Sequence, residues 1–316
     1  MTCRLEALVA AAAVALACGP GGGPTPRGPG PLTAPNPATP TATDPLGDVA
    51  LGDAVEAGGP RFRHVFVIIL ENRRYAGVIG NPAAPYANEL AGRYASAADF
   101  HAAESPSLPN YLIAVAGQDF GVRDDGPPER HLQDAPTIAD QLDAAGLEWR
   151  AYMESMPQPC TQQSGGLYAV KHNPFLYFRS FRDDAVRCAD HDVPYDLFAA
   201  DLAVGRRAFY WITPDLRDDG HDTGAARADR WLAENVPAII ASPAWQDGGV
   251  LFITWDEGVP GDEHIPLLAV SPLARPGYAS PEAYDHRSLL ATIEDVLGLP
   301  RLAATVGVAA MNDLFQ

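Results

Sequence analysis

The stretch HVFVIIL, residues His64–Leu70, decides the fold because it is a continuous run of mostly apolar and β-branched residues. A strand that is apolar on both faces is typical of the middle of a parallel sheet covered on both sides. Similar stretches occupy residues 147–153, 208–213, 250–255 and 266–271, and helix-like stretches occupy 135–146, 225–241 and 287–297. This alternation predicts an α/β fold, a three-layer α/β/α sandwich with a mostly parallel central sheet.

The composition places this fold in residues 61–316, which are long enough for one large domain with its own core. The whole chain of 316 residues has 40 acidic and 22 basic residues, a formal charge of −18. Residues 61–316 hold 35 acidic and 20 basic residues, so most of the negative charge belongs to the domain. Such a charge disfavours nucleic acid as a partner and anionic lipid as a docking surface.

The first 60 residues have the features of an export signal followed by a tether. Residues 1–18 contain Arg4, an apolar run over 8–17 and then Cys18. That run is too short to span a bilayer and has the length of the apolar region of a signal peptide. The residues before Cys18 loosely match a bacterial lipoprotein cleavage site, which makes Cys18 a candidate lipid anchor; cleavage and secretion is the alternative. Residues 19–60 hold 10 Pro and 10 Gly, which predicts a disordered tether. We therefore expect an exported protein, either a cell-surface lipoprotein or a secreted one, whose only membrane contact is this anchor.

The domain contains two cysteines, Cys160 and Cys188. In an oxidising compartment they can close a loop with a disulfide, and the alternative is two separate buried thiols. Neither belongs to a CxxC pair, so the sequence does not favour a zinc site.

Side chains with metal-binding chemistry follow two predicted strands. Glu71 and Asn72 come directly after His64–Leu70, and Asp256 and Glu257 come directly after 250–255. An acidic group at the end of a buried strand is either solvated or compensated by a partner. Because ligands of such sheets bind at the carboxyl ends of the strands, the two pairs can converge as hard oxygen ligands of one divalent cation.

Ser107, His172 and His221 are the other candidates for chemistry. Ser107 lies in SPSLPNY, residues 105–111, just before an apolar helix-like run. A hydroxyl at that position is either an N-cap or a nucleophile activated by a metal, next to backbone N–H groups that favour an anion. His172 follows Lys171, the chain's single lysine, and His221 lies among carboxylates in DDGHD, 218–222. Each imidazole can bind a metal, contact phosphate or act as a general acid, although an ordinary surface histidine is the alternative.

Several reaction classes lack their sequence motifs. The chain has no GxSxG, HExxH, Walker A or GxGxxG sequence. Serine hydrolases of the α/β-hydrolase type, thermolysin-like proteases, and ATP- and NAD-dependent enzymes are therefore not indicated.

Six segments follow one another along the domain: HVFVIILENRRY (64–75), SPSLPNYLIAVAG (105–117), YAVKHNPFLYF (168–178), FYWITPDLRDDGHD (209–222), LFITWDEG (251–258) and YDHRSLLATIEDVLGLP (284–300). Together and in this order, they resemble the phosphoesterase family of bacterial acid phosphatases and phospholipases C, within the alkaline-phosphatase-like superfamily. The chain length and the SPSLPNY form are most similar to the acid phosphatase and phosphatidylinositol-phosphatase branch.

The resemblance implies a role for each matching residue. The implied nucleophile is Ser107, which would also touch the metal. Where some relatives have a second histidine this chain has Lys171, which implies positive charge at that place. The implied metal ligands are Glu71, Asn72, Ser107, Asp256 and Glu257. The implied catalytic residues are Ser107, His172 and His221, the implied substrate-binding residues are Asn110, Lys171 and Asp222, and the implied disulfide joins Cys160 to Cys188.

The implied activity is hydrolysis of phosphoric monoesters with a divalent metal ion and a phosphoseryl intermediate. The substrate would be a phosphorylated small molecule or a lipid headgroup, with phosphoinositides among the candidates. Oxygen-rich ligands accept Mg²⁺, Ca²⁺, Mn²⁺ or Zn²⁺. A protonated histidine suits an acidic optimum, so we expect best activity below pH 7. One alternative is a phospholipase C-type phosphodiesterase, and another is a non-catalytic surface lipoprotein stabilised by metal.

Overall fold

Strand β1 has the bounds His64–Leu70 that the sequence predicts, and all of its residues are buried. It pairs in parallel with β5, Phe209–Thr213, on one side and with β6, Gly249–Trp255, on the other. The structure is a computed structural model that describes residues 61–316. The predicted signal peptide with Cys18 and the predicted tether over 19–60 lie outside the described residues.

The sheet of the described residues has eight strands in the order β4-β3-β5-β1-β6-β7-β2-β8. Every neighbouring pair is parallel except the two pairs that β7 makes with β6 and β2. The prediction of a mostly parallel sheet is therefore confirmed. The remaining strands are β2 (Ala95–His101), β3 (Trp149–Met153), β4 (Asp192–Pro194), β7 (Leu267–Val270) and β8 (Ala279–Asp285).

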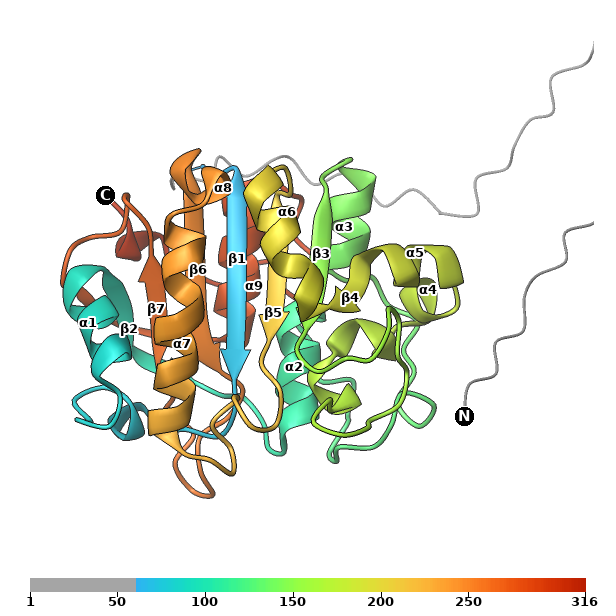
Figure 1. The fold of residues 1–316 in the computed structure, drawn as a ribbon, viewed down its shortest axis with the longest axis horizontal. Helices are drawn as coiled ribbons and strands as arrows, with labels where there is room; N and C mark the ends of the chain where they lie inside the picture. The colour runs from blue at the N-terminus through green and yellow to red at the C-terminus, as the bar shows by residue number, and fades with distance from the viewer. Residues whose placement is uncertain (1–60) are drawn as a thin grey trace, which may run out of the picture. The chain divides into compact units, whose positions relative to one another are not determined.

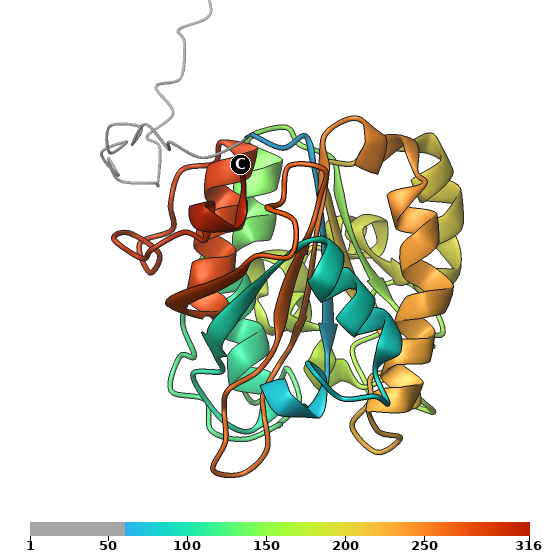
Figure 2. The ribbon, with the colours of Figure 1, turned by 90° about the vertical axis from the view of Figure 1, so that its left-hand side faces the viewer.

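Helices cover both faces of the sheet, which makes the three layers that the sequence predicts. Figures 1 and 2 show α1, α6, α7 and α8 on one face and α2, α3 and α9 on the other. The α-helices are α1 (Pro85–Arg93), α2 (Ser107–Ala116), α3 (Ile138–Ala144), α4 (Arg179–Arg182), α5 (Ala185–His191), α6 (Phe198–Val204), α7 (Ala225–Ile240), α8 (Pro243–Gln246) and α9 (His286–Leu297). Short 3₁₀ helices are η1 (Tyr75–Gly77), η2 (Val170–His172), η3 (Pro174–Tyr177), η4 (Tyr195–Leu197) and η5 (Asn312–Leu314).

Three strands, β2, β4 and β8, have no apolar run that reveals them. The sequence of β2 is ASAADFH, in which small residues fill three of the four buried positions. Strand β8, ASPEAYD, lies at the edge of the sheet and leaves most of its residues exposed. An edge strand needs fewer apolar residues, and such strands escape a search for apolar runs.

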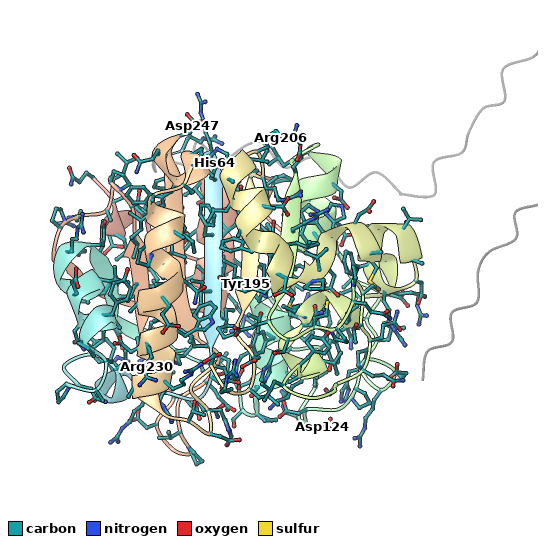
Figure 3. The ribbon with its side chains drawn as sticks, in the orientation of Figure 1. His64, Asp124, Tyr195, Arg206, Arg230 and Asp247 are labelled. Carbon is teal, nitrogen blue, oxygen red and sulfur yellow. A yellow bond between two sulfur atoms is a disulfide. The ribbon has the colours of Figure 1, made fainter. Side chains whose placement is uncertain are left out.

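The two ends of the parallel strands have different surroundings. His64 begins β1, and its ring lies 3.7 Å from the carboxylate of Asp247. Figure 3 shows these two residues at the amino end of β1, and it shows Asp124 on the opposite side of the molecule, beyond the carboxyl end of β1. The loops on the side of Asp124 follow the carboxyl ends of the parallel strands, and a ligand of this type of sheet is expected there.

A disulfide joins Cys160, in the segment after β3, to Cys188 in α5, as the sequence predicts. Among residues 61–316, none of the helices combines the length and the apolar character that crossing a membrane requires.

Candidate active site

Ser107 is the first residue of α2 and is buried, with 2% of its surface exposed. The residue in the N-cap position is Pro106, so the hydroxyl of Ser107 does not serve as the cap. The Ser107 Oγ lies 3.1 Å from Glu71 Oε2 and 3.4 Å from Glu257 Oε1. It also lies 3.4 Å from Lys171 Nζ. The start of α2 therefore holds a hydroxyl between two carboxylates and one ammonium group.

The two acidic pairs meet because their strands are neighbours. Leu70 of β1 stands opposite Trp255 of β6 in a parallel register, so the residues that follow lie side by side. The backbone N–H of Asn72 donates to Asp256 Oδ1 at 2.9 Å, and its side-chain amide donates to Glu257 Oε1 at 2.9 Å. Asn72 has a φ of 40°, a left-handed conformation that asparagine tolerates better than most residues.

The oxygen atoms that follow the carboxyl ends of β1 and β6 fit the binding of a divalent cation. Asn72 Oδ1 and Asp256 Oδ2 are buried oxygens that have no hydrogen-bond partner among the described residues. With Glu71, Glu257 and the Ser107 hydroxyl they form a group of hard oxygen donors, the type that Mg²⁺, Ca²⁺ and Mn²⁺ prefer. Burial raises the pKa of Glu71 to about 7 and raises the pKa of Asp256. Buried carboxylates that are hard to ionise alone gain most from a cation.

Two aromatic residues hold Glu71 from the other side. The hydroxyl of Tyr111 donates to Glu71 Oε1 at 2.7 Å, and His172 Nε2 lies 3.2 Å from the same oxygen. The Tyr111 and His172 rings stack with centroids 5.4 Å apart. Tyr111 is absent from the sequence-based site, although its spacing of four from Ser107 places both on one face of α2. Burial, together with the positive charge of Lys171, lowers the pKa of His172 to about 4.

Asp219 is a further buried acid that the sequence analysis does not single out. Its Oδ2 lies 4.0 Å from His172 Nδ1, and burial raises its pKa to about 7. Its backbone carbonyl accepts a hydrogen bond from the backbone N–H of Glu71 at 3.0 Å. Asp219 thus connects the segment after β5 to the end of β1, behind His172.

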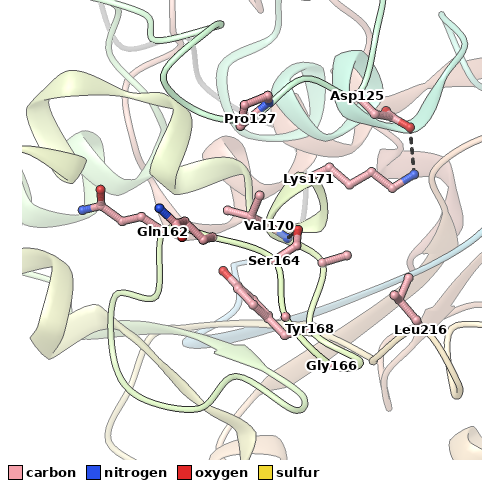
Figure 4. Close-up of a pocket in the computed structure, with 12 residues that line it drawn as sticks. Asp125, Pro127, Gln162, Ser164, Gly166, Tyr168, Val170, Lys171 and Leu216 are labelled. Atoms are coloured by element: carbon pink, nitrogen blue, oxygen red, sulfur yellow. Dashed lines mark hydrogen bonds and ion pairs between the residues drawn. The ribbon is translucent and has the colours of Figure 1, made fainter.

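Lys171 is held by Asp125. The ammonium nitrogen lies 2.8 Å from Asp125 Oδ2, and Asp125 Oδ1 accepts a hydrogen bond from the backbone N–H of Leu108 at 3.0 Å. One carboxylate therefore ties the lysine to the first turn of α2. Figure 4 shows this ion pair at the side of a pocket of about 530 Å³.

The structure places three predicted site residues away from this cluster. The His221 ring is half-exposed and pairs with Asp222, and no hydrogen bond or ion pair within residues 61–316 joins it to Ser107 or Glu71. Asp222 is exposed. Asn110 is buried, but its side chain is bonded to the backbone of Glu104. Its amide nitrogen donates to the Glu104 carbonyl at 2.7 Å, and its amide oxygen accepts from the Glu104 N–H at 3.0 Å, which fixes the loop before α2.

Within residues 61–316, two groups bring three potential ligand atoms within 4.8 Å of one another, and neither contains a predicted ligand. One is Asp99, His101 and His264, on the surface; the other is Glu154, Asp215 and Asp218. In the second group Arg217 and Arg227 already neutralise Asp218.

Comparisons with known proteins show the family of the chain. The sequence profile of the Phosphoesterase family matches residues 81–300. A phosphatidylinositol-3-phosphatase of Mycobacterium tuberculosis is 30% identical over 259 residues, covering 81% of this chain and 84% of that protein. An acid phosphatase of Aspergillus fumigatus is 26% identical over 259 residues, covering 77% of this chain and 57% of that protein. The chain thus spans little more than half of the fungal relative.

Among solved structures, a protein of the alkaline phosphatase superfamily from Vibrio parahaemolyticus superimposes with a TM-score of 0.54. The match covers 79% of this chain and 70% of that one at 13% identity, which shows a shared fold. The predicted fold class is confirmed, and the non-catalytic alternative is wrong because the relatives are phosphatases. The chain belongs to the phosphoesterase family and is an enzyme that acts on phosphoester bonds.

Proposed function

We propose that the protein is a metal-dependent phosphomonoesterase of the acid phosphatase type, with Ser107 as its nucleophile. The observation that carries this proposal is the Ser107 hydroxyl, buried at the first turn of α2 with carboxylate oxygens 3.1 and 3.4 Å away. A serine at a helix N-terminus faces backbone N–H groups that attract an anion such as phosphate. The relatives named acid phosphatase and phosphatidylinositol-3-phosphatase support the substrate class.

The cation would be held by Glu71, Asn72, Asp256 and Glu257, together with Ser107. When bound, it would screen the charge of the phosphate and lower the pKa of a coordinated hydroxyl. Tyr111 orients Glu71 through a hydrogen bond of 2.7 Å to one oxygen, and His172 packs beside that oxygen with its Nε2 3.2 Å away, so the other oxygen stays directed at Ser107.

In the first half of the reaction, the Ser107 oxygen attacks phosphorus and the bond from phosphorus to the leaving oxygen breaks. The leaving group departs as an alcohol, and the proton that Ser107 gives up balances the one the alcohol takes. The hydroxyl proton has the Glu71 carboxylate as its nearest acceptor at 3.1 Å. Lys171, 3.4 Å from the same hydroxyl, stabilises the negative charge of the phosphoryl oxygens. In the second half, water attacks the phosphoseryl group, which releases inorganic phosphate and restores the serine hydroxyl.

We propose different roles for the two histidines. Burial and the positive charge of Lys171 lower the pKa of His172 to about 4, which favours a neutral ring over a protonated acid. We assign it to orienting Glu71. For His221 we keep the proposed role of contacting the phosphate or the leaving group, which requires its half-exposed ring to leave Asp222. An optimum below pH 7 stays a prediction supported by the relatives named acid phosphatases.

We also propose that the enzyme is exported, either anchored through a lipid on Cys18 or secreted. The disulfide between Cys160 and Cys188 supports an oxidising compartment. Mass spectrometry of the mature N-terminus decides between a lipidated Cys18 and an unmodified cleaved end.

The test of the activity is phosphate release from a panel of monoesters, with and without EDTA, by the wild-type protein and Ser107→Ala. We expect EDTA to stop the reaction, a divalent ion to restore it, and Ser107→Ala to lose at least about 10³-fold in kcat. Ser96→Ala, at a buried serine of β2, is the matched control. Full activity of Ser107→Ala would remove the nucleophile assignment.

The same assay separates a phosphomonoesterase from a phospholipase C. With phosphatidylinositol 3-phosphate in vesicles, a monoesterase releases inorganic phosphate and leaves phosphatidylinositol. A phospholipase C instead releases a phosphorylated headgroup and leaves diacylglycerol, and that product would replace our assignment.

A further inference from the structure

The pocket beside Lys171 lies next to the proposed nucleophile and has no assigned ligand. Its volume is about 530 Å³, within the range of small-molecule sites. Lys171 belongs to its wall, and the ammonium group of Lys171 also lies 3.4 Å from the Ser107 hydroxyl. Lys171 therefore connects the pocket to the place where a phosphate would bind at Ser107. The rest of the substrate can lie in the pocket.

The wall of the pocket combines apolar side chains with neutral polar ones. Figure 4 shows Pro127, Val170 and Leu216 around it, with Ser164 between them. The Ser164 oxygen accepts a hydrogen bond from the backbone N–H of Val170, which leaves its hydroxyl hydrogen free to donate. Gln163 also lines the pocket, is exposed, and makes no side-chain hydrogen bond to another described residue. A ligand with an apolar face and hydroxyl groups along its edge matches this wall.

The aromatic content of the wall disfavours a nucleobase. Tyr168 is the aromatic residue that lines the pocket, and only 3% of its surface is exposed. Its hydroxyl is already bonded to the carbonyl of Thr161 at 2.8 Å. A base is commonly held by stacking on an open aromatic face, and the tyrosine does not offer one.

The charge of the wall disfavours a second phosphate. Among the residues that line the pocket, Lys171 is the cationic one, and Asp125 pairs with it at 2.8 Å. That single lysine also serves the phosphate at Ser107. A leaving group that carried another phosphate would meet Asp125 with no further positive charge to offset it.

We propose that this pocket binds the leaving alcohol of the substrate, and that the alcohol is an uncharged polyhydroxylated ring, a sugar or a cyclitol, bearing one phosphate. This inference rests on the proposed function of Ser107. Gln163 and Ser164 bond the ring hydroxyls, while Pro127, Val170 and Leu216 pack against its C–H face. The rim is anchored because residues 161–166 directly follow Cys160, which is bonded to Cys188.

Gly165 offers a way to fill the pocket. It lines the pocket, and a Cβ placed on it meets no atom within 4 Å, so a larger side chain is tolerated by the surrounding fold. Gly165→Phe adds a large side chain at the wall of the pocket, and Gln163→Ala removes one polar contact from an exposed position. Gln158→Ala is the matched control, because Gln158 is an exposed glutamine of the same segment that does not line the pocket.

The experiment measures kcat/KM of the full chain for glucose 6-phosphate, AMP, fructose 1,6-bisphosphate and p-nitrophenyl phosphate. Phosphatidylinositol 3-phosphate in vesicles is a separate arm. Its leaving group carries an anionic phosphodiester, so a higher kcat/KM for this lipid than for glucose 6-phosphate would overturn the assignment of an uncharged free ring. The reactivity of p-nitrophenyl phosphate comes mainly from its good leaving group, so it reports on Ser107 more than on the pocket.

We expect wild type to prefer glucose 6-phosphate over AMP and the bisphosphate. The ratio of kcat/KM for glucose 6-phosphate to that for p-nitrophenyl phosphate should fall about 10-fold or more in Gly165→Phe and about 3-fold or more in Gln163→Ala. Gln158→Ala should keep the ratio. An unchanged ratio in both pocket variants, or an equal loss on both substrates, overturns the inference. If wild type releases phosphate from none of these esters, the proposed function itself fails, which is a distinct result.

Discussion

The ammonium nitrogen of Lys171 lies 3.4 Å from the hydroxyl oxygen of Ser107. This contact places the only lysine of the chain beside the proposed nucleophile of a domain with 35 acidic and 20 basic residues. An acidic protein that handles an anionic substrate needs local positive charge, and here a lysine held by Asp125 supplies part of it. The negative surface and the phosphate chemistry are therefore compatible.

Removing the charge of Lys171 should lower activity without unfolding the protein. We expect Lys171→Met to lower kcat/KM about 10²-fold, because a preorganised cation next to the reacting phosphate is lost. Steady-state phosphate release measures the effect, and Arg130→Met, at an exposed arginine, controls for loss of charge in general. Activity within threefold of wild type would show that Lys171 does not face the phosphate.

The hydrogen bond from Tyr111 to Glu71 should support metal binding. Tyr111→Phe removes a 2.7 Å bond to a carboxylate that we assign as a ligand, so we expect the metal concentration for half-maximal activity to rise about tenfold. Activity should return at high metal concentration. Tyr210→Phe is the control, since the buried Tyr210 hydroxyl has no hydrogen-bond partner within residues 61–316. An equal response of the two variants would contradict a role specific to Glu71.

Metal binding should compete with protons. Without a cation, the pKa of Glu71 is raised to about 7, so this carboxyl is mostly protonated at pH 5 and about half ionised at pH 7. A cation must displace that proton, and its apparent affinity should rise as the pH rises from 5 to 7. We expect the half-saturating metal concentration to be about tenfold or more higher at pH 5 than at pH 7. Titrations of EDTA-treated protein with Mg²⁺, Ca²⁺, Mn²⁺ and Zn²⁺ at both values test this, and equal midpoints would refute it.

The sequence reveals the parts of this protein that are encoded locally. HVFVIIL predicts β1 with its observed bounds because a strand buried on both faces needs an unbroken apolar run. Glu71, Asn72, Asp256 and Glu257 are predictable as a group because they end two strands of one sheet. Ser107 emerges from its place before an apolar helix.

The rest depends on contacts between segments distant in the chain. Asp125 reaches Lys171 across 46 positions, and Tyr111 reaches Glu71 across 40, and neither pairing leaves a pattern in the sequence. Asp219 shows the same limit, because an aspartate in DDGHD reads as solvated until β5 is known to lie beside β1. His221 is the opposite case. Its sequence motif points to the site, but the fold leaves its ring half-exposed and paired with Asp222.

Asp192 should make the protein less stable as the pH rises. Its carboxyl group is buried at the start of β4, where the amide of Asn173 lies 2.9 Å from both oxygens, and burial raises its pKa to about 8. The unfolded value is near 3.8, so between about pH 4 and pH 8 the folded state binds a proton that the unfolded state does not. The free energy of unfolding therefore falls with rising pH across this window, and the protonated form is favoured at its acidic end.

Asp192→Asn replaces this group with a neutral one of the same shape and should remove that dependence. We expect the Tm of wild type to drop between pH 5 and pH 8 by at least about 5 °C more than the Tm of Asp192→Asn, which corresponds to a difference of roughly 2 kcal/mol in a domain of this size. Asp190→Asn, at an exposed aspartate two residues earlier, should behave as wild type. Thermal melts followed by circular dichroism at the two pH values measure the difference, and parallel curves for all three proteins would mean that Asp192 is ionised in the folded state.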